Sequence, residues 1–234
     1  MTQNRSTAVM ARRSVAADSL DYFPTPPWGT RALCEVVLGG RSALSGLTCW
    51  EPACGEGHMA RPLGEFFGVV HASDVYPHGY GESGDFLDEG LGTFWQPPEP
   101  VDWIITNPPF HAGEAFARRS LSIARAGVAL LLRSAWMEGI ERDALFRTHP
   151  LSIYAPFIER LAMVEGRLER KASSATAYAW FVWVRGANET RLVRIPPGSK
   201  RRFDRDDDWR RNADISATPL FGPGHPTETP ESTQ

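Results

Sequence analysis

The sequence predicts an α/β fold built on a doubly wound, mostly parallel sheet of seven strands. Stretches of strand character alternate with stretches of helical spacing along most of the chain, which is typical of β–α–β units. The run VALLL at 128–132 is apolar throughout, as expected for a strand covered on both faces. With 234 residues, the chain is long enough for one domain with a sizeable core.

The expected elements follow one another in a regular order. Residues 29–38 have helical spacing and end at Gly39-Gly40, which is a typical helix stop. The expected strands lie at 46–51, 69–76, 101–107, 127–136, 151–156 and 176–186, and the further helices at 58–67, 113–126 and 141–149. Sheets of this kind bind ligands at the carboxyl ends of their strands, so residues that follow the strands are the candidates for a site.

Composition divides the chain into three parts. Residues 1–20 are expected to be a flexible N-terminus, residues 21–195 the folded domain, and residues 196–234 a charged, proline-rich and largely disordered tail. The net charge of −3 argues against a protein that binds nucleic acid through its overall charge. Nine Lys and Arg against five Asp and Glu between Arg185 and Arg211 fit either phosphate contacts or a solvated charged tail.

The three cysteines, Cys34, Cys49 and Cys54, form no CxxC pair and no His/Cys cluster with metal-ligand spacing. No structural metal is therefore expected. The protein is expected to lie in a reducing, cytoplasmic compartment. The first residues lack the apolar stretch of a secretory signal, and no run of about 18 apolar residues predicts a membrane span.

A glycine-containing turn, EPACGEG at 51–57, follows the first expected strand. Gly55 and Gly57 supply positive φ and allow close approach to a ligand. The third glycine of a dinucleotide fingerprint is missing, and Glu51 stands where a pyrophosphate would be repelled. An acid here suits a ligand with a cationic group and hydroxyls, such as S-adenosylmethionine. The turn alone fits a simple tight turn equally well.

Two further acids extend this pattern. Asp74 ends the next strand, at the position where doubly wound nucleotide sites place an acid on ribose hydroxyls. Asp85 and Phe86 follow in a loop, where the pair could hydrogen-bond and stack on an adenine ring. Asp85 is also explained as a loop cap.

The stretch VDWIITNPPF, 101–110, ends an apolar strand in a rigid corner. An exocyclic amino group of a base is a poor nucleophile because its lone pair is delocalised into the ring. Two acceptors on its N–H groups, the side-chain oxygen of Asn107 and the backbone carbonyl of Pro108, would drive that nitrogen toward sp³ character. Pro109 stiffens the corner, and Phe110 offers a ring for stacking a flipped base.

The order FPTPP (23–27), EPACGEG (51–57), Asp74, Asp85 and NPPF (107–110) resembles the class I amino-methyltransferases that act on DNA adenine or cytosine. The likeness covers roughly residues 21–185, and the later strands resemble those of small phage and prophage adenine methyltransferases. The resemblance implies a Rossmann-like class I methyltransferase fold, S-adenosylmethionine as cofactor and a cytoplasmic site of action in a bacterial or phage-infected cell.

The resemblance also implies a set of site residues. The catalytic set is Asn107, Pro108, Pro109 and Phe110. The cofactor-binding set is Thr25, Pro26, Glu51, Pro52, Ala53, Gly55, Gly57, Asp74, Val75, Asp85, Phe86 and Asn107. The substrate-binding set is Phe110, Trp180 and Phe181, although the strand that holds Trp180 and Phe181 is equally well explained as buried core.

Two departures from the family pattern bear on the substrate. Glu51 stands where the family commonly has Asp. Only 49 residues separate Gly57 from Asn107 and little ordered chain is expected after the last strand, so no target-recognition domain is expected. Recognition of a sequence is then expected to be weak, to be limited to a very short site, or to come from a protein partner. The expected activity is N6 methylation of adenine in DNA; the alternatives are an RNA base, the glutamine amide of a release factor, or a catalytically silent binding module.

Overall fold

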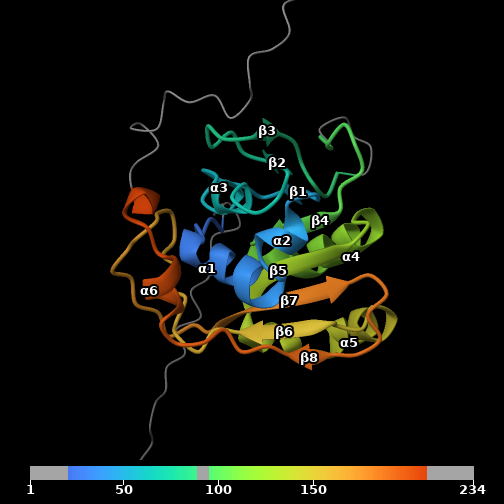
Figure 1. Cartoon of the computed structure of the whole chain (residues 1–234). Coiled ribbons are helices and arrows are strands. Elements are labelled where there is room, and N and C mark those ends of the chain that lie inside the picture. Colours follow the sequence, from blue (N-terminus) through green and yellow to red (C-terminus); the bar gives the residue numbers. More distant parts are fainter. Residues whose placement is uncertain (1–20, 89–94, 210–234) are drawn as a thin grey trace, which may run out of the picture.

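The structure, a computed structural model, describes residues 21–88 and 95–209. Its centre is an eight-stranded sheet with the order β3-β2-β1-β4-β5-β7-β6-β8 (Figure 1). The strands are β1 (Thr48–Glu51), β2 (Val69–Asp74), β3 (Glu82–Ser83), β4 (Trp103–Thr106), β5 (Gly127–Arg133), β6 (Ile153–Pro156), β7 (Tyr178–Val184) and β8 (Arg191–Leu192). Only β7 runs antiparallel to its neighbours. The predicted doubly wound, mostly parallel sheet is confirmed, but it has eight strands instead of seven, because β8 extends it beyond β6.

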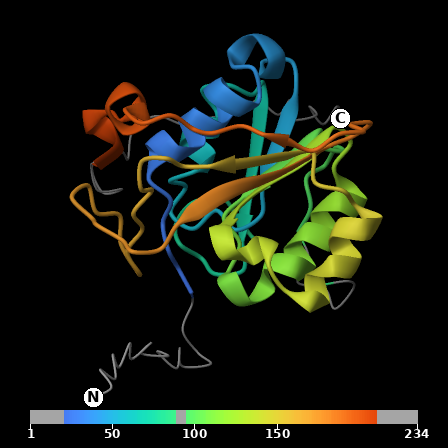
Figure 2. The ribbon, with the colours of Figure 1, turned by 90° about the horizontal axis from the view of Figure 1, so that it is seen from below.

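Helices cover both faces of this sheet, as Figure 2 shows. The α-helices are α1 (Pro27–Ala32), α2 (Arg41–Leu44), α3 (Ala60–Leu63), α4 (Gly113–Ile123), α5 (Ile140–Thr148) and α6 (Ser199–Phe203). A π-helical turn, η1 (Leu33–Val37), continues α1. The 3₁₀ turns are η2 (Phe110–Ala112), η3 (Ser134–Met137) and η4 (Asp206–Trp209). None of the helices in the described ranges is long and apolar enough to cross a bilayer.

The strands divide the core between the two faces by their alternation. Trp103, Ile105 and Leu131 pack with α1 in one cluster, whereas Ile104 and Leu130 pack with α4 and α5 in the other. Successive side chains of a strand point to opposite faces, so an all-apolar strand must be covered twice. This explains why β4 and β5 lack polar residues over most of their length.

The structure corrects the predicted tail boundary at residue 196. Residues 199–209 form α6 and η4, and Phe203 is buried beside α1. Arg31, on α1, donates to both carboxylate oxygens of Asp208 (2.7 and 2.8 Å) and to the Phe203 carbonyl (2.9 Å). The charge-dense segment thus folds because its acids find long-range partners. The predictions for residues 1–20 and 210–234 lie outside the described residues.

Candidate functional site

A cavity of about 320 Å³ opens at the carboxyl edge of the sheet. Ten of the residues predicted to form the site line it: Thr25, Glu51, Pro52, Ala53, Asp74, Val75, Asp85, Phe86, Asn107 and Pro109. They come from the ends of β1, β2 and β4, from the loop after β3 and from the segment before α1. Neighbouring parallel strands end at the same edge of a sheet, so residues far apart in sequence meet there. The volume is within the range of small-ligand sites.

Glu51 is the most buried charge in this cavity, with a residue exposure of 2%. Its Oε2 atom is enclosed and has no hydrogen-bond partner. Burial, and next the nearby charge of Asp74, raise the pKa of Glu51 well above its usual value. A buried carboxylate without a counter-charge is costly, so a cationic ligand group would stabilise it.

Asp74 supports the glycine turn. One of its oxygens accepts the Gly55 N–H (2.8 Å), and the other accepts the Tyr76 N–H (2.9 Å). Each carboxylate oxygen can accept a second hydrogen bond, so Asp74 can hold the turn and still receive hydroxyl groups. The acid at the end of β2 therefore has a structural role in addition to its predicted ligand role.

Gly55 and Gly57 do not belong to the cavity lining. Both have positive φ (51° and 80°), and a Cβ on either would overlap an aromatic ring, at 2.4 Å from Tyr22 and 2.7 Å from Tyr80. The glycines thus let two tyrosines pack on the turn, while its neighbours Pro52, Ala53 and Cys54 face the cavity. The sequence predicted that a ligand approaches these glycines, and in this structure a tyrosine ring lies against each of them.

Phe86 is 2% exposed and contacts Trp50 edge-on, with a ring-centroid distance of 5.1 Å, and Phe116 at 4.9 Å. Asp85, beside it, accepts the Leu87 N–H at 2.8 Å. This bond is the loop cap that the sequence offered as an alternative. Both residues nevertheless line the cavity, so the cap leaves the predicted ligand role open.

Asn107 has a defined side-chain orientation. Its Nδ2 donates to the backbone carbonyl of Phe23 at 2.9 Å and lies 3.7 Å from the Met163 sulfur. A carbonyl can only accept, so the nitrogen must face Phe23 and the oxygen must face away from it. The Oδ1 atom is enclosed at the cavity wall without a hydrogen-bond partner. An unsatisfied buried acceptor costs free energy, which a donor from a ligand would recover.

The segment 21–25 connects the two halves of the site. Asp21 accepts the Phe110 N–H at 2.5 Å, and the Tyr22 hydroxyl accepts the Glu56 N–H at 3.3 Å. The Tyr22 ring stacks on His78 with centroids 4.7 Å apart. This segment therefore lies against both the glycine turn and the Asn107 corner. From this part of the chain the sequence predicted only Thr25 and Pro26 as site residues. Asp21 and Tyr22 could have been found as a polar and an aromatic residue directly before FPTPP.

Phe110 lies beside the cavity and outside its lining. Its ring packs on Phe23, with centroids 5.0 Å apart, and on Tyr178 at 6.1 Å, and the Arg133 guanidinium lies 4.3 Å above it. Pro26 and Pro108 are likewise buried next to the lining and do not form it. The rigid corner thus presents Asn107 and Pro109 to the cavity and Phe110 to the neighbouring surface.

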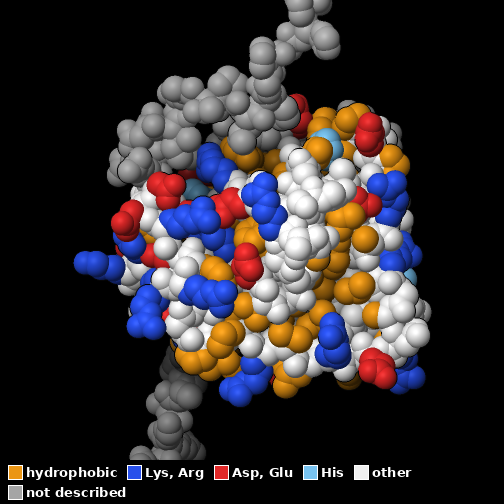
Figure 3. Space-filling model, in the orientation of Figure 1, with side chains coloured by type: hydrophobic (Ala, Val, Ile, Leu, Met, Phe, Trp, Pro, Cys, Tyr) orange, Lys and Arg blue, Asp and Glu red, His pale blue; other side chains and the backbone are white. Residues whose placement is uncertain are grey.

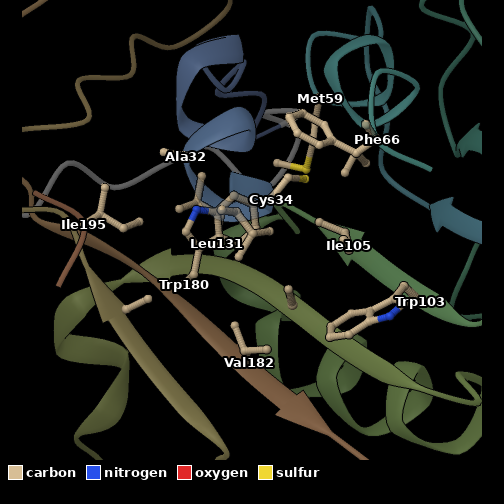
Figure 4. Close-up of a cluster of buried hydrophobic side chains, with 14 of the residues drawn as sticks. Ala32, Cys34, Met59, Phe66, Trp103, Ile105, Leu131, Trp180, Val182 and Ile195 are labelled. Carbon is tan, nitrogen blue, oxygen red and sulfur yellow. The ribbon is translucent and has the colours of Figure 1, made fainter. Parts of the chain in front are cut away.

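The structure does not bring Trp180 and Phe181, which the sequence predicted as substrate-binding residues, to the cavity. Both are wholly buried, with 0% exposure, and lie outside the cavity lining. Trp180 points from β7 toward α1 (Figure 4), where its indole N–H donates to the Gly29 carbonyl at 3.3 Å, and Phe181 packs on the opposite face. Because β7 is a central strand covered on both faces, its aromatic residues form core.

Comparison with known proteins agrees with this topology. No protein-family model matches the chain. It is similar to the type I restriction-modification system methyltransferase subunit of Streptococcus thermophilus (15% identity, TM-score 0.55, 82% of this chain and 51% of that one). It is also similar to a Listeria monocytogenes protein assigned to the class I S-adenosylmethionine-dependent methyltransferases (12% identity, TM-score 0.54, 77% of this chain and 69% of that one). The chain has the Rossmann-like class I methyltransferase fold.

Among curated proteins, the chain is 35% identical over 108 residues to the type II methyltransferase M.TthHB8I of Thermus thermophilus. That match covers 42% of this chain and 23% of the relative. The chain thus aligns with less than a quarter of the relative's length and with about half of the Streptococcus subunit.

Proposed function

We propose that this chain transfers a methyl group from S-adenosylmethionine to an exocyclic amino group of a nucleic-acid base, with N6 of adenine in DNA as the preferred target. The observation that carries the proposal is the orientation of Asn107, whose amide nitrogen is held by Phe23 and whose oxygen is left without a partner. The partial likeness to a type II methyltransferase supports DNA as the substrate class.

The residues of the cavity fit this cofactor. Glu51 offers a buried carboxylate for an ammonium group, Asp74 has acceptor positions for ribose hydroxyls, and Asp85 and Phe86 stand together for an adenine ring. S-adenosylmethionine supplies an electrophilic methyl group when bound. The unpartnered Glu51 oxygen is the strongest sign of the fit, because a neutral ligand would leave that carboxylate unbalanced.

The catalytic contribution of this chain is positioning. The Asn107 oxygen would accept one N–H of the target amino group. The carbonyl of Pro108, which lies next to the cavity lining and outside it in this structure, would accept the other. Both acceptors belong to a rigid corner, with Asn107 held by Phe23 and the Phe110 N–H held by Asp21, so little reorganisation accompanies the reaction. Sequence recognition would come from a protein partner or from a part of the protein that is not described.

A labelling experiment tests this function. The purified protein is incubated with radiolabelled S-adenosylmethionine and, in parallel, with duplex DNA, single-stranded DNA, RNA or a release factor, and the digested products are identified. We expect N6-methyladenine in DNA. Label found only in RNA, or only in the release factor, would show that this molecule and not DNA is the substrate. Cofactor binding without label in any substrate would indicate a silent binding module.

The burial of Glu51 predicts an unusual pH dependence of stability and of cofactor affinity. The pKa of Glu51 is higher in the folded protein than in the unfolded chain, so the folded protein holds more protons between about pH 4.5 and that raised pKa. The free energy of unfolding therefore decreases as pH rises through this range. An ammonium group favours the ionised carboxylate, so cofactor binding is expected to release a proton and to tighten as pH rises.

Calorimetric titration in two buffers of different ionisation enthalpy measures the proton release, and melting temperatures from pH 5 to 8 measure the stability. Glu51→Gln should lose both dependences, while Glu189→Gln, an exchange of an exposed loop carboxylate, should keep them. Equal proton release by wild type and Glu51→Gln would show that another group is responsible.

A further inference from the structure

Arg133 occupies a position that the proposed function does not use. It is the last residue of β5 and pairs with Tyr178, the first residue of β7. In the strand order β2-β1-β4-β5-β7, Asp74 and Glu51 lie on one side of the Asn107 corner and Arg133 lies on the other. A substrate presented to Asn107 from the side opposite the cofactor residues would therefore approach over Arg133.

The contacts of Arg133 differ from those of the paired arginines Arg31 and Arg170. Its guanidinium lies 4.3 Å from the centroid of the Phe110 ring, and Arg133 is the cross-strand neighbour of the buried Tyr178. Within residues 21–88 and 95–209, no carboxylate lies within ion-pair distance of this exposed arginine. Arg31 and Arg170, by contrast, each pair with two acids.

Phe110 is covered on several sides by this arrangement. Phe23 and Tyr178 pack around its ring, and the Arg133 guanidinium lies over a face. A guanidinium and a nucleobase are both flat groups that stack on an aromatic ring, so they compete for that face. The ring next to the reactive corner can receive a base only when the arginine moves off it.

We propose that Arg133 binds a backbone phosphate next to the target nucleotide and, by turning toward it, exposes the Phe110 ring to the target base. The inference rests on the proposed function and adds a substrate-binding residue to it. A guanidinium binds phosphate through two parallel hydrogen bonds, which replace its stacking on Phe110. The phosphate contact thereby places the nucleotide while the stacking surface becomes available.

The α6 region is a weaker candidate for such a contact. Blue and red side chains are intermingled on the side of the molecule where α1 and α6 lie (Figure 3), and Asp204, Asp206 and Asp208 pair with arginines there. Each acid that pairs with an arginine there reduces the charge left for a phosphate, whereas Arg201 and Arg202 of α6 have no ion pair within the described residues. Arg133 keeps its full charge and lies at the end of the strand next to β4.

The test compares Arg133→Gln, Arg133→Lys and Arg191→Gln with the wild type. Arg191 is an exposed arginine at the start of β8 and pairs with Ile153, the first residue of β6. It therefore lies at the amino ends of the parallel strands, away from the carboxyl ends that form the site. Binding of a fluorescein-labelled DNA duplex is measured by anisotropy between about 50 and 200 mM salt. Cofactor affinity is measured by calorimetry on the same preparations, which also shows that each variant is folded.

We expect Arg133→Gln to weaken duplex binding about tenfold and to reduce the slope of log K against log salt by about 0.9, with unchanged cofactor affinity. Arg133→Lys should keep the slope, because the charge remains, and Arg191→Gln should match the wild type. A wild-type slope in Arg133→Gln would overturn the inference while methylation by the wild type upheld the proposed function. If the wild type methylated no nucleic acid, both the inference and the proposed function would be wrong.

Discussion

Replacing Asn107 with alanine is expected to lower kcat by about 10²- to 10³-fold and to change the affinity for S-adenosylmethionine by less than about twofold. The asymmetry follows from geometry. The Asn107 amide is oriented by the Phe23 carbonyl, and its oxygen is the enclosed acceptor without a partner at the cavity wall. Its interaction with the amino group strengthens only as that nitrogen becomes tetrahedral, so the loss falls on the transition state.

Single-turnover methylation of DNA and calorimetric cofactor binding measure the two quantities separately. Asn188→Ala, in an exposed loop, is the matched control and should behave as the wild type. Asp74→Ala should show the opposite pattern, with cofactor affinity reduced about tenfold or more, because both its turn-supporting bonds and its acceptor positions are lost. A near-normal kcat in Asn107→Ala would remove this corner from the mechanism.

Replacing Arg31 with alanine is expected to lower the free energy of unfolding by about 3–5 kcal/mol. Arg31 is 4% exposed and lies between Glu65 and Asp208, with ion-pair distances of 2.8 and 2.7 Å. Burial lowers the pKa of Arg31, but its hydrogen bonds to Asp208 and Glu65 outweigh that effect and raise it. Its removal leaves the Asp208 carboxylate, whose side chain is 7% exposed, without its buried partner.

Urea denaturation followed by circular dichroism measures this loss, and tryptic cleavage at Arg201 and Arg202 reports release of α6. Arg170→Ala is the control, since Arg170 bridges Asp204 and Asp206 in the same segment but is exposed, so its loss should be much smaller. Adding Asp208→Ala to Arg31→Ala should cost little more, because the pair is already broken. Additive losses would show that the two residues do not act as a pair.

Much of the site was accessible from the sequence because its residues follow strands. Asp74 and Asn107 each follow an apolar stretch at the expected position, and the structure places both at one cavity. Trp180 and Phe181 show the limit of this reasoning. An aromatic run near the end of a fold has the same pattern in a base pocket and in a buried strand, and only the packing against α1 and α5 separates the two.

The sequence by itself determined the doubly wound sheet and the rigid corner at 107–110, because periodicity and proline act over a few neighbouring residues. Only the tertiary structure decided which way the Asn107 amide faces, since its partner Phe23 is 84 positions away. It also decided that the charged segment after residue 196 folds, through an Arg31–Asp208 pair 177 positions apart. Such partners are selected when distant segments come together, and nothing in the local pattern of either residue specifies the other.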